Sequence, residues 1–290
     1  MSAMIRVGQA GHPPGASDLV DAVERTRALG LDAMEVQFVR NVSIQEAVAH
    51  EAGRRARELG VVLSAHAPYY ISLNSMNEET VAKSRDWVMR TARAAKMMGA
   101  WIIVVHAASY SGTSSEKATK KVIEGISLCR RILDLENNDV VIGLETMGKK
   151  GQWGTIAEIQ QVMSHVHGVQ PVIDFAHLHA RGGGSIKGRE GFESVLAEHD
   201  ALPVKRTHCH FSGIEYTGAG EKNHSGLDSG SPDYEPLAEL LARSERHITL
   251  ISETPSPIDG ALKMKAMLER CSGATRTDRN KAIHYITPVD

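Results

Sequence analysis

The sequence is poor in aromatic residues and cysteine. Aromatic residues make up 4% of the 290 residues, so the stacked aromatic platforms that bind single-stranded bases are scarce. Cys129, Cys209 and Cys271 stand far apart and form no CxxC pair, which excludes a zinc knuckle and a disulfide framework. We therefore expect a reduced, cytoplasmic setting.

Long apolar runs and an excess of one charge are also missing. No uncharged apolar run reaches about 18 residues, and the start MSAMIRVGQAG has no apolar core of a secretory signal, so we expect no membrane contact. The 33 Lys and Arg against 35 Asp and Glu give a net charge of −2, which argues against binding nucleic acid by charge alone. Nothing indicates an obligate protein partner. The unusual count is 14 histidines, which points to metal or proton chemistry.

Short apolar runs alternate with longer amphipathic segments along the chain. Eight such pairs predict an α/β fold, a single (β/α)8 TIM barrel. A doubly wound open sheet usually has a glycine-rich turn after its first strand, and Gly8-Gln9-Ala10-Gly11-His12 matches that pattern poorly. We expect a metalloenzyme barrel over residues 1–270 and a C-terminal arm over 271–290. The predicted strands are 4–8, 33–38, 61–65, 101–105, 140–144, 171–175, 206–211 and 247–252, and the predicted helices are 17–29, 44–58, 78–98, 115–135, 155–165, 189–198, 234–244 and 258–270.

Each of the last six predicted strands has a histidine or an acidic residue within one position of its end. In a barrel the C-terminal ends of the strands meet at one rim, where active sites form. One histidine at a strand end is usually a hydrogen-bonded structural residue, but several buried carboxylates repel one another unless a cation lies between them. The pattern therefore predicts a metal site built from His66, His106, Glu145, Asp174, His177, His210, His224 and Glu253.

The type and number of these ligands narrow the choice of metal. Imidazole with carboxylate suits Zn²⁺, Mn²⁺ or Fe²⁺. Eight ligands exceed what one ion takes, so the sequence predicts at least two ions with one bridging carboxylate. His208 lies two residues before His210 on the same predicted strand and can face the same side. We expect His208 in the core beside a ligand.

Motifs over residues 4–270 resemble endonuclease IV, the family 2 apurinic/apyrimidinic endonucleases of the xylose isomerase-like barrel superfamily. The resemblance implies a zinc-dependent enzyme of DNA base excision repair that hydrolyses the phosphodiester 5′ to abasic sites, with abasic DNA as its partner. Two or three Zn²⁺ are implied, with Mn²⁺ as a substitute. The motifs are HAPYYISLN at 66–74, VVHAASYSG at 104–112, GLETMGKKGQWGT at 143–155, IDFAH at 173–177, HFSG at 210–213, NH at 223–224 and SETPSP at 252–257.

The same resemblance assigns roles to individual residues. Glu145 is the expected catalytic residue, because it would bridge two ions. Tyr69 matches a tyrosine of the DNA-contacting loop, and Arg40 is a candidate phosphate contact, as are Lys149, Lys150, Arg181, Lys187 and Arg189. By motif, the first zinc takes His66, His106 and Glu145; the second takes Glu145, Asp174, His210 and Glu253; the third takes His177 and His224.

The sequence departs from the family pattern at four places. Ser72 replaces an asparagine, Phe175-Ala176 replaces Thr-Cys, and HFSG at 210–213 replaces HxND. Lys222 stands two residues before His224, where the family has a carboxylate for the third zinc. Glu221 and Asp228 are the alternative carboxylates, and the chain looks like a divergent branch.

Two other functions fit parts of the pattern. A divalent-metal sugar isomerase or epimerase of the same superfamily would use one ion held by Glu145, Asp174, His210 and Glu253, but would not need four further histidines. A non-catalytic, metal-dependent DNA-binding or partner module with the same fold is the other alternative, and Lys222 is the residue that keeps it open.

Overall fold

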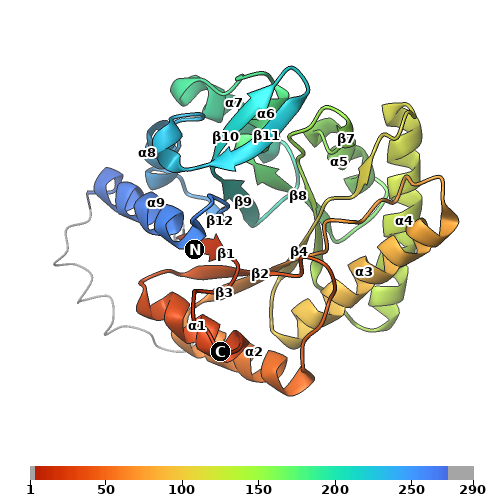
Figure 1. Cartoon of the computed structure of the whole chain (residues 1–290), viewed down its shortest axis with the longest axis horizontal. Coiled ribbons are helices and arrows are strands. Elements are labelled where there is room, and N and C mark those ends of the chain that lie inside the picture. The colour runs from red at the N-terminus through yellow and green to blue at the C-terminus, as the bar shows by residue number, and fades with distance from the viewer. Residues whose placement is uncertain (1–3, 274–290) are drawn as a thin grey trace.

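A closed barrel of parallel strands forms the centre of the molecule (Figure 1). The computed structural model describes residues 4–273. Around the barrel the order is β1-β2-β3-β4-β6-β8-β9-β12, and β12 closes on β1 with Met4 opposite His247. The predicted (β/α)8 barrel is therefore confirmed. The strands are β1 (Met4–Ala10), β2 (Ala33–Gln37), β3 (Val62–His66), β4 (Ile102–Val105), β6 (Val141–Glu145), β8 (Val169–Asp174), β9 (Thr207–Phe211) and β12 (His247–Ser252).

Helices surround the barrel and begin at capping residues that the sequence supplies. Asp18 accepts a hydrogen bond from the backbone N–H of Asp21, Asn77 caps α3 in the same way, and Thr155 forms a reciprocal capping box with Glu158. The helices are α1 (Leu19–Ala28), α2 (Glu46–Leu59), α3 (Glu78–Met97), α4 (Ser115–Leu135), α5 (Ile156–Met163), α6 (Phe175–Arg181), α7 (Gly188–Asp200), α8 (Glu235–Ala242) and α9 (Pro257–Cys271).

The strands are buried on both faces, as a parallel barrel requires. On β4, Ile103 and Val105 belong to the large apolar cluster that includes the helices, whereas Ile102 and Val104 pack with Val172 in a separate small cluster. This alternation places the second set inside the barrel. The barrel interior is thus apolar at this level, and polar side chains follow toward the C-terminal ends of the strands.

Several elements after the strand ends were not predicted. They are the helix α6, the paired short strands β5 (Ala108–Ser109) and β7 (Gln152–Trp153), the hairpin β10 (Gly213–Thr217) with β11 (Gly220–Ser225), and the 3-10 turn η1 (Leu227–Ser229). The hairpin was missed because its sequence, GIEYTGAGEKNHS, has few apolar residues and no clear alternation. These elements matter because they add walls to the rim.

Two sequence expectations concern the chain ends and membranes. Helix α9 ends at Cys271, and residues 274–290 of the predicted C-terminal arm lie outside the described residues. Within the described part of the chain, no helix is both long and apolar enough to cross a membrane.

Candidate metal centre

All eight predicted ligands converge at the C-terminal rim of the barrel. The strands position them: His66, Glu145 and Asp174 are the last residues of β3, β6 and β8, and His210 lies near the end of β9. Glu253 follows β12 directly, and the remaining three come from the loop after β4, from α6 and from β11. Within the described residues they fall into groups whose candidate ligand atoms all lie within 4.8 Å of one another: His66, His106 and Glu145; Glu145, Asp174, His210 and Glu253; and Asp174, His177 and His224.

The first group surrounds one oxygen of Glu145. Oε2 of Glu145 lies 3.3 Å from Nε2 of His66 and 2.8 Å from Nε2 of His106. His66 and Glu145 are both buried, and His106 is partly exposed toward the cleft. The group therefore opens on one side, as a metal site that admits substrate must.

The second group surrounds the other oxygen of Glu145. Oε1 of Glu145 lies 3.4 Å from Nδ1 of His210, and that same nitrogen lies 4.0 Å from Asp174 Oδ2 and 3.6 Å from Glu253 Oε2. Three of these buried atoms, namely Nδ1 of His210, Oε1 of Glu145 and Oδ2 of Asp174, have no hydrogen-bond partner among the described residues. Buried polar atoms without partners are costly, so this convergence fits a bound cation.

The third group joins α6 to the hairpin. Nε2 of His177 lies 3.2 Å from Nε2 of His224. Two nitrogens that each bond a tetrahedral zinc at about 2.0–2.1 Å are separated by roughly this distance. Oε2 of Glu221 lies 3.6 Å from Nε2 of His177, and Oε1 lies 4.0 Å from Nε2 of His224. Besides Asp174, Glu221 is therefore a second carboxylate that the structure brings to this pair.

A β-bulge explains why Glu221, and not Lys222, faces the two histidines. Glu215 of β10 pairs with Asn223, and Tyr216 pairs with Glu221, so Lys222 is the extra residue on β11. A bulge resets the alternation of side chains along a strand. Lys222 is exposed and donates to Glu215 at 2.9 Å. The other alternative, Asp228, is exposed and pairs with Lys263 on α9.

Three of the histidines are oriented by backbone carbonyls. The Nδ1–H of His66 donates to the carbonyl of Ala67 at 2.7 Å, that of His177 to Thr146 at 2.9 Å, and that of His224 to Glu253 at 3.0 Å. A neutral imidazole that donates with one nitrogen presents a lone pair on the other. Each of these rings therefore presents Nε2 to the cluster as a possible ligand atom.

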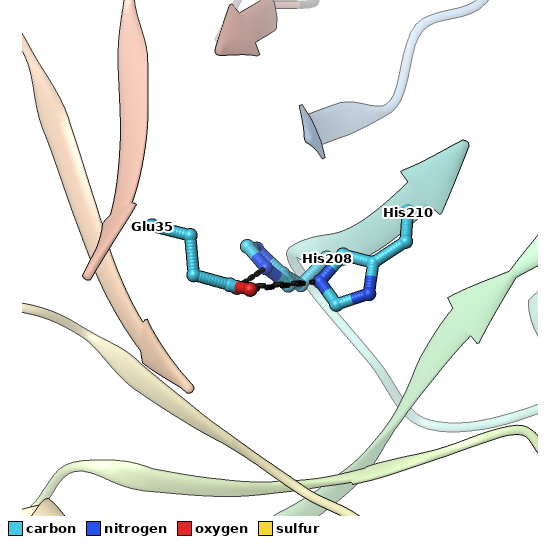
Figure 2. Close-up of side chains that lie close together, drawn as sticks. All are labelled: Glu35, His208 and His210. Atoms are coloured by element: carbon cyan, nitrogen blue, oxygen red, sulfur yellow. Dashed lines mark hydrogen bonds and ion pairs between the residues drawn. The ribbon is translucent and has the colours of Figure 1, made fainter. Parts of the chain in front are cut away.

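His210 is oriented in the opposite sense by Glu35, a residue that the sequence analysis missed (Figure 2). Nε2 of His210 lies 3.2 Å from Oε1 of Glu35, and Nδ1 faces the second group. His208 also faces Glu35, with Nε2 2.8 Å from Oε2, so it lies in the core beside His210. The sequence signal for Glu35 was a lone carboxylate in the apolar run AMEVQF. The alternation of side chains along the strand points this carboxylate toward the barrel interior.

The electrostatics of the cluster raise the pKa of His66, His177 and His210 and so favour positive charge at these three rings. Burial alone would raise the pKa of Glu145, but His106 and His210 hold it well below its ordinary range. Burial would lower the pKa of His177, but Asp174 and Glu145 raise it to about 10. A divalent cation bonded to the same atoms would supply this positive charge without protonation of the rings. The donor set thus fits a divalent metal.

A cleft of about 550 Å³ opens over the cluster, and His106, His177, His224, Glu221 and Glu253 are among its lining residues. Tyr69 lies in its wall, 43% exposed, with its ring centroid 4.7 Å from that of His66. Lys149 also lines it, whereas Arg40 is exposed and lies outside the set of described residues that line the cleft.

Arg181 has a structural part at this rim. Its guanidinium donates to the carbonyls of Lys149 at 2.7 Å and Gln152 at 2.9 Å, and to the hydroxyl of Tyr110 at 3.1 Å. These bonds hold the segment that carries Lys149 against α6. Arg181 is therefore bonded to protein partners and is not simply a solvated surface charge, and its contact with phosphate stays a prediction.

Comparison with known proteins gives relatives over most of the chain. The family model described as xylose isomerase-like TIM barrel matches residues 23–271. An uncharacterized protein of Methanocaldococcus jannaschii is 33% identical over 92% of this chain and 98% of its own length. A probable endonuclease 4 of Staphylococcus carnosus is 30% identical over 71% of each chain.

Solved structures of both kinds of enzyme that the sequence suggested share the fold of this chain. Endonuclease IV from Thermus thermophilus superposes with a TM-score of 0.74 at 23% identity, covering 91% of this chain and 99% of its own. The 3-keto-D-glucoside 4-epimerase of E. coli superposes with a TM-score of 0.67 at 17% identity, covering 92% of this chain and 100% of its own. At these identities the likeness concerns the fold alone.

Proposed function

Because this chain belongs to the endonuclease IV family of the xylose isomerase-like TIM barrel superfamily, as a divergent branch, we propose that it is a divalent-metal-dependent phosphodiesterase acting on abasic DNA. Zinc is the metal proposed, and the bond cut is the phosphodiester 5′ to the abasic site. The catalytic residue is Glu145, and the ligands are the eight residues predicted from the sequence together with Glu221.

The observation that supports this proposal best is the position of Glu145 between two groups of ligands. Oε2 faces His66 and His106, and Oε1 faces His210 at 3.4 Å. One carboxylate whose oxygens face opposite groups is suited to bridge two ions. A single-ion isomerase would leave His66 and His106 without a use.

The residues of the cluster would hold two or three ions. When bound, such ions supply Lewis-acid stabilisation of phosphodiester oxygens and a water of lowered pKa. The protein's own part is to fix the ligand geometry: the backbone carbonyls of Ala67, Thr146 and Glu253 orient three histidine rings. Glu221 takes the place of the carboxylate that the family has two residues before the last histidine.

The cleft walls would hold the DNA backbone. Lys149 lines the cleft and supplies positive charge near the cluster, which suits a phosphate. Tyr69 presents a half-exposed ring beside His66, where it can pack against deoxyribose or a base. An abasic nucleotide costs less to extrude than a normal one, because less stacking is broken.

The test is incision of a duplex that carries one synthetic abasic site, with an undamaged duplex of the same sequence beside it. We expect a single cut 5′ to the site, loss of cutting with chelator, and recovery with Zn²⁺ or Mn²⁺. Epimerisation of ketoses by the same preparation, without incision, would replace the proposal with the sugar-enzyme alternative. Metal-dependent retention of abasic DNA without cutting would favour a binding module.

A pair of variants connects the incision to this site. Glu145→Gln removes the bridging charge and should abolish cutting, whereas Glu46→Gln changes a carboxylate that is 77% exposed on α2 and should cut normally. Equal activity of the two variants would remove Glu145 from the proposed mechanism.

A further inference from the structure

Glu35 is not one of the eight predicted ligands, but its candidate ligand atom lies within 4.8 Å of those of His66 and Glu253, and it connects two parts of the site. We propose that Glu35 is a positioning residue that fixes the His210 ring toward the ions and, through Gln37, holds Tyr69 at the cleft. The inference rests on the proposed metal centre for its first half. Its test therefore includes measurements that do not depend on DNA incision.

The link to His210 follows from how the other rings are oriented. Three histidines of the cluster donate Nδ1–H to a backbone carbonyl and present Nε2. His210 presents Nδ1 instead, and its Nε2 faces the carboxylate of Glu35 at 3.2 Å. An ionised carboxylate only accepts hydrogen bonds, so the ring N–H must donate to it. Glu35 thus has the orienting role that backbone carbonyls have for the other rings.

Other hydrogen bonds hold Glu35 itself in place. Oε2 accepts from the hydroxyl of Ser64 at 3.0 Å and from Nε2 of His208 at 2.8 Å, and Oε1 accepts from the amide of Gln37 at 3.0 Å. The side chains of Glu35, His208 and His210 are 0% exposed. The carboxylate therefore has a single well-defined position from which it can orient His210.

The link to the cleft runs through Gln37. Its amide N–H₂ donates to Glu35, so its carbonyl Oε1 points the other way and accepts from the hydroxyl of Tyr69 at 2.8 Å. Tyr69 and Gln37 both line the cleft. A continuous chain of hydrogen bonds thus runs from a metal-ligand histidine to a half-exposed ring that substrate can touch.

An ion held by Glu35, His208 and His210 is the competing reading, because candidate ligand atoms of these residues lie within 4.8 Å of one another. One observation argues against it. Nδ1 of His210 already faces the second group of ligands, so His210 would have to bind ions through both of its ring nitrogens.

The test of the first link compares Glu35→Gln with Ser64→Ala, which removes a different partner of the same carboxylate. Metal content is measured by elemental analysis, affinity by competition with a chromophoric chelator, and ligand geometry by the visible spectrum of the Co²⁺-substituted protein. For Glu35→Gln we expect the wild-type number of ions, an affinity about 10–100-fold weaker for one of them, and an altered Co²⁺ spectrum. Ser64→Ala leaves the bonds of Glu35 to His208, His210 and Gln37 in place, so each of the three measurements should change far less than in Glu35→Gln.

Three outcomes would overturn this link. Unchanged affinity and spectrum in Glu35→Gln would show that His210 needs no such partner, and a loss of one whole ion would establish the competing metal site. An equal defect in Ser64→Ala would mean that Glu35 contributes to packing in this region and does not specifically orient His210. If Glu35→Gln does not fold, Glu35→Asp keeps the charge on a shorter side chain, and the same affinity and spectral changes are expected of it in weaker form.

The second link is tested by Gln37→Leu, which breaks the chain between Glu35 and Tyr69. Metal affinity and the Co²⁺ spectrum should stay as in wild type, while KM for abasic DNA rises several-fold with a smaller change in kcat. A lowered metal affinity, or an unchanged KM, would overturn the link to Tyr69. If the wild-type protein does not cut DNA at all, the proposed activity fails, but the metal measurements still decide the first link.

Discussion

The carboxylate of Glu221 lies beside the ring of His177, with Oε2 3.6 Å from Nε2, although Glu221 is three residues and not two before His224. The bulge at Lys222 brings about this placement. The chain thereby places a second acidic side chain near His177 and His224, while Lys222 occupies the position at which the resemblance to endonuclease IV implies a carboxylate. Glu221 and Lys222 are therefore a matched pair for mutation.

We predict that Glu221→Gln weakens or removes one bound ion, whereas Lys222→Gln does not. Glu221 faces two histidines at the cleft, and Lys222 is exposed and bonded to Glu215. Elemental analysis of both purified variants measures the difference directly. If Glu221→Gln and wild type hold the same amount of metal at the same free-metal concentration, Glu221 is not a ligand of a third ion.

We predict that the wild-type protein holds two or three equivalents of divalent metal and that Glu145→Gln loses affinity for more than one of them. A bridging carboxylate belongs to two groups at once, so its loss should exceed the roughly 10–100-fold effect of mutating a residue that only orients a ligand. Chelator should also lower the wild-type Tm, because ions that bind only the folded state stabilise it. A single ion at saturation would contradict the multinuclear centre.

The strand-end ligands could be predicted because a barrel brings the ends of all its strands to one rim. His66, Glu145 and Asp174 needed only the position of the strand ends. Glu35 is different: it lies in the middle of β2, and its use depends on His208 and His210 from β9, 173 and 175 residues further on. Nothing local to β2 reveals that proximity.

The choice between Glu221 and Asp228 could not be made from the sequence for a similar reason. A hairpin register with a bulge depends on how β10 and β11 pair, and regular alternation would have turned Lys222 toward His224. The carbonyl partners of Arg181 could not be predicted either, because they come from a segment about 30 residues earlier in the chain.

We predict that Arg181→Ala destabilises the protein more than Arg189→Ala does, and that Arg181→Ala also impairs substrate binding. Removing the Arg181 guanidinium leaves the carbonyls of Lys149 and Gln152 without this donor, at a cost of about 1–3 kcal/mol. It also loosens the segment that brings Lys149 to the cleft, so KM for abasic DNA should rise. Urea unfolding and steady-state kinetics measure the two effects.

Arg189 is the control for that comparison. It is 44% exposed and pairs with Glu193 one turn further along α7, an arrangement that contributes about 0–0.5 kcal/mol. A similar loss of stability in both variants would mean that the bonds from Arg181 to the rim carbonyls are not what stabilises this segment.

We predict that His199 makes the folded state less stable in mild acid. Burial lowers the pKa of His199 below its ordinary value of 6.5, against the opposing effect of Asp200, so the unfolded chain binds the proton more readily than the folded one. The favourable contribution of neutral His199 is thus present above about pH 6.5 and is lost as the pH falls through the lower, folded-state pKa.

In His199→Leu this loss of stability in acid is absent. Urea unfolding of both proteins with excess chelator, from pH 8 down to pH 5, should therefore give a steeper decline for wild type. Their difference at pH 8 reports packing alone, so parallel curves from pH 8 to pH 5 would contradict the prediction.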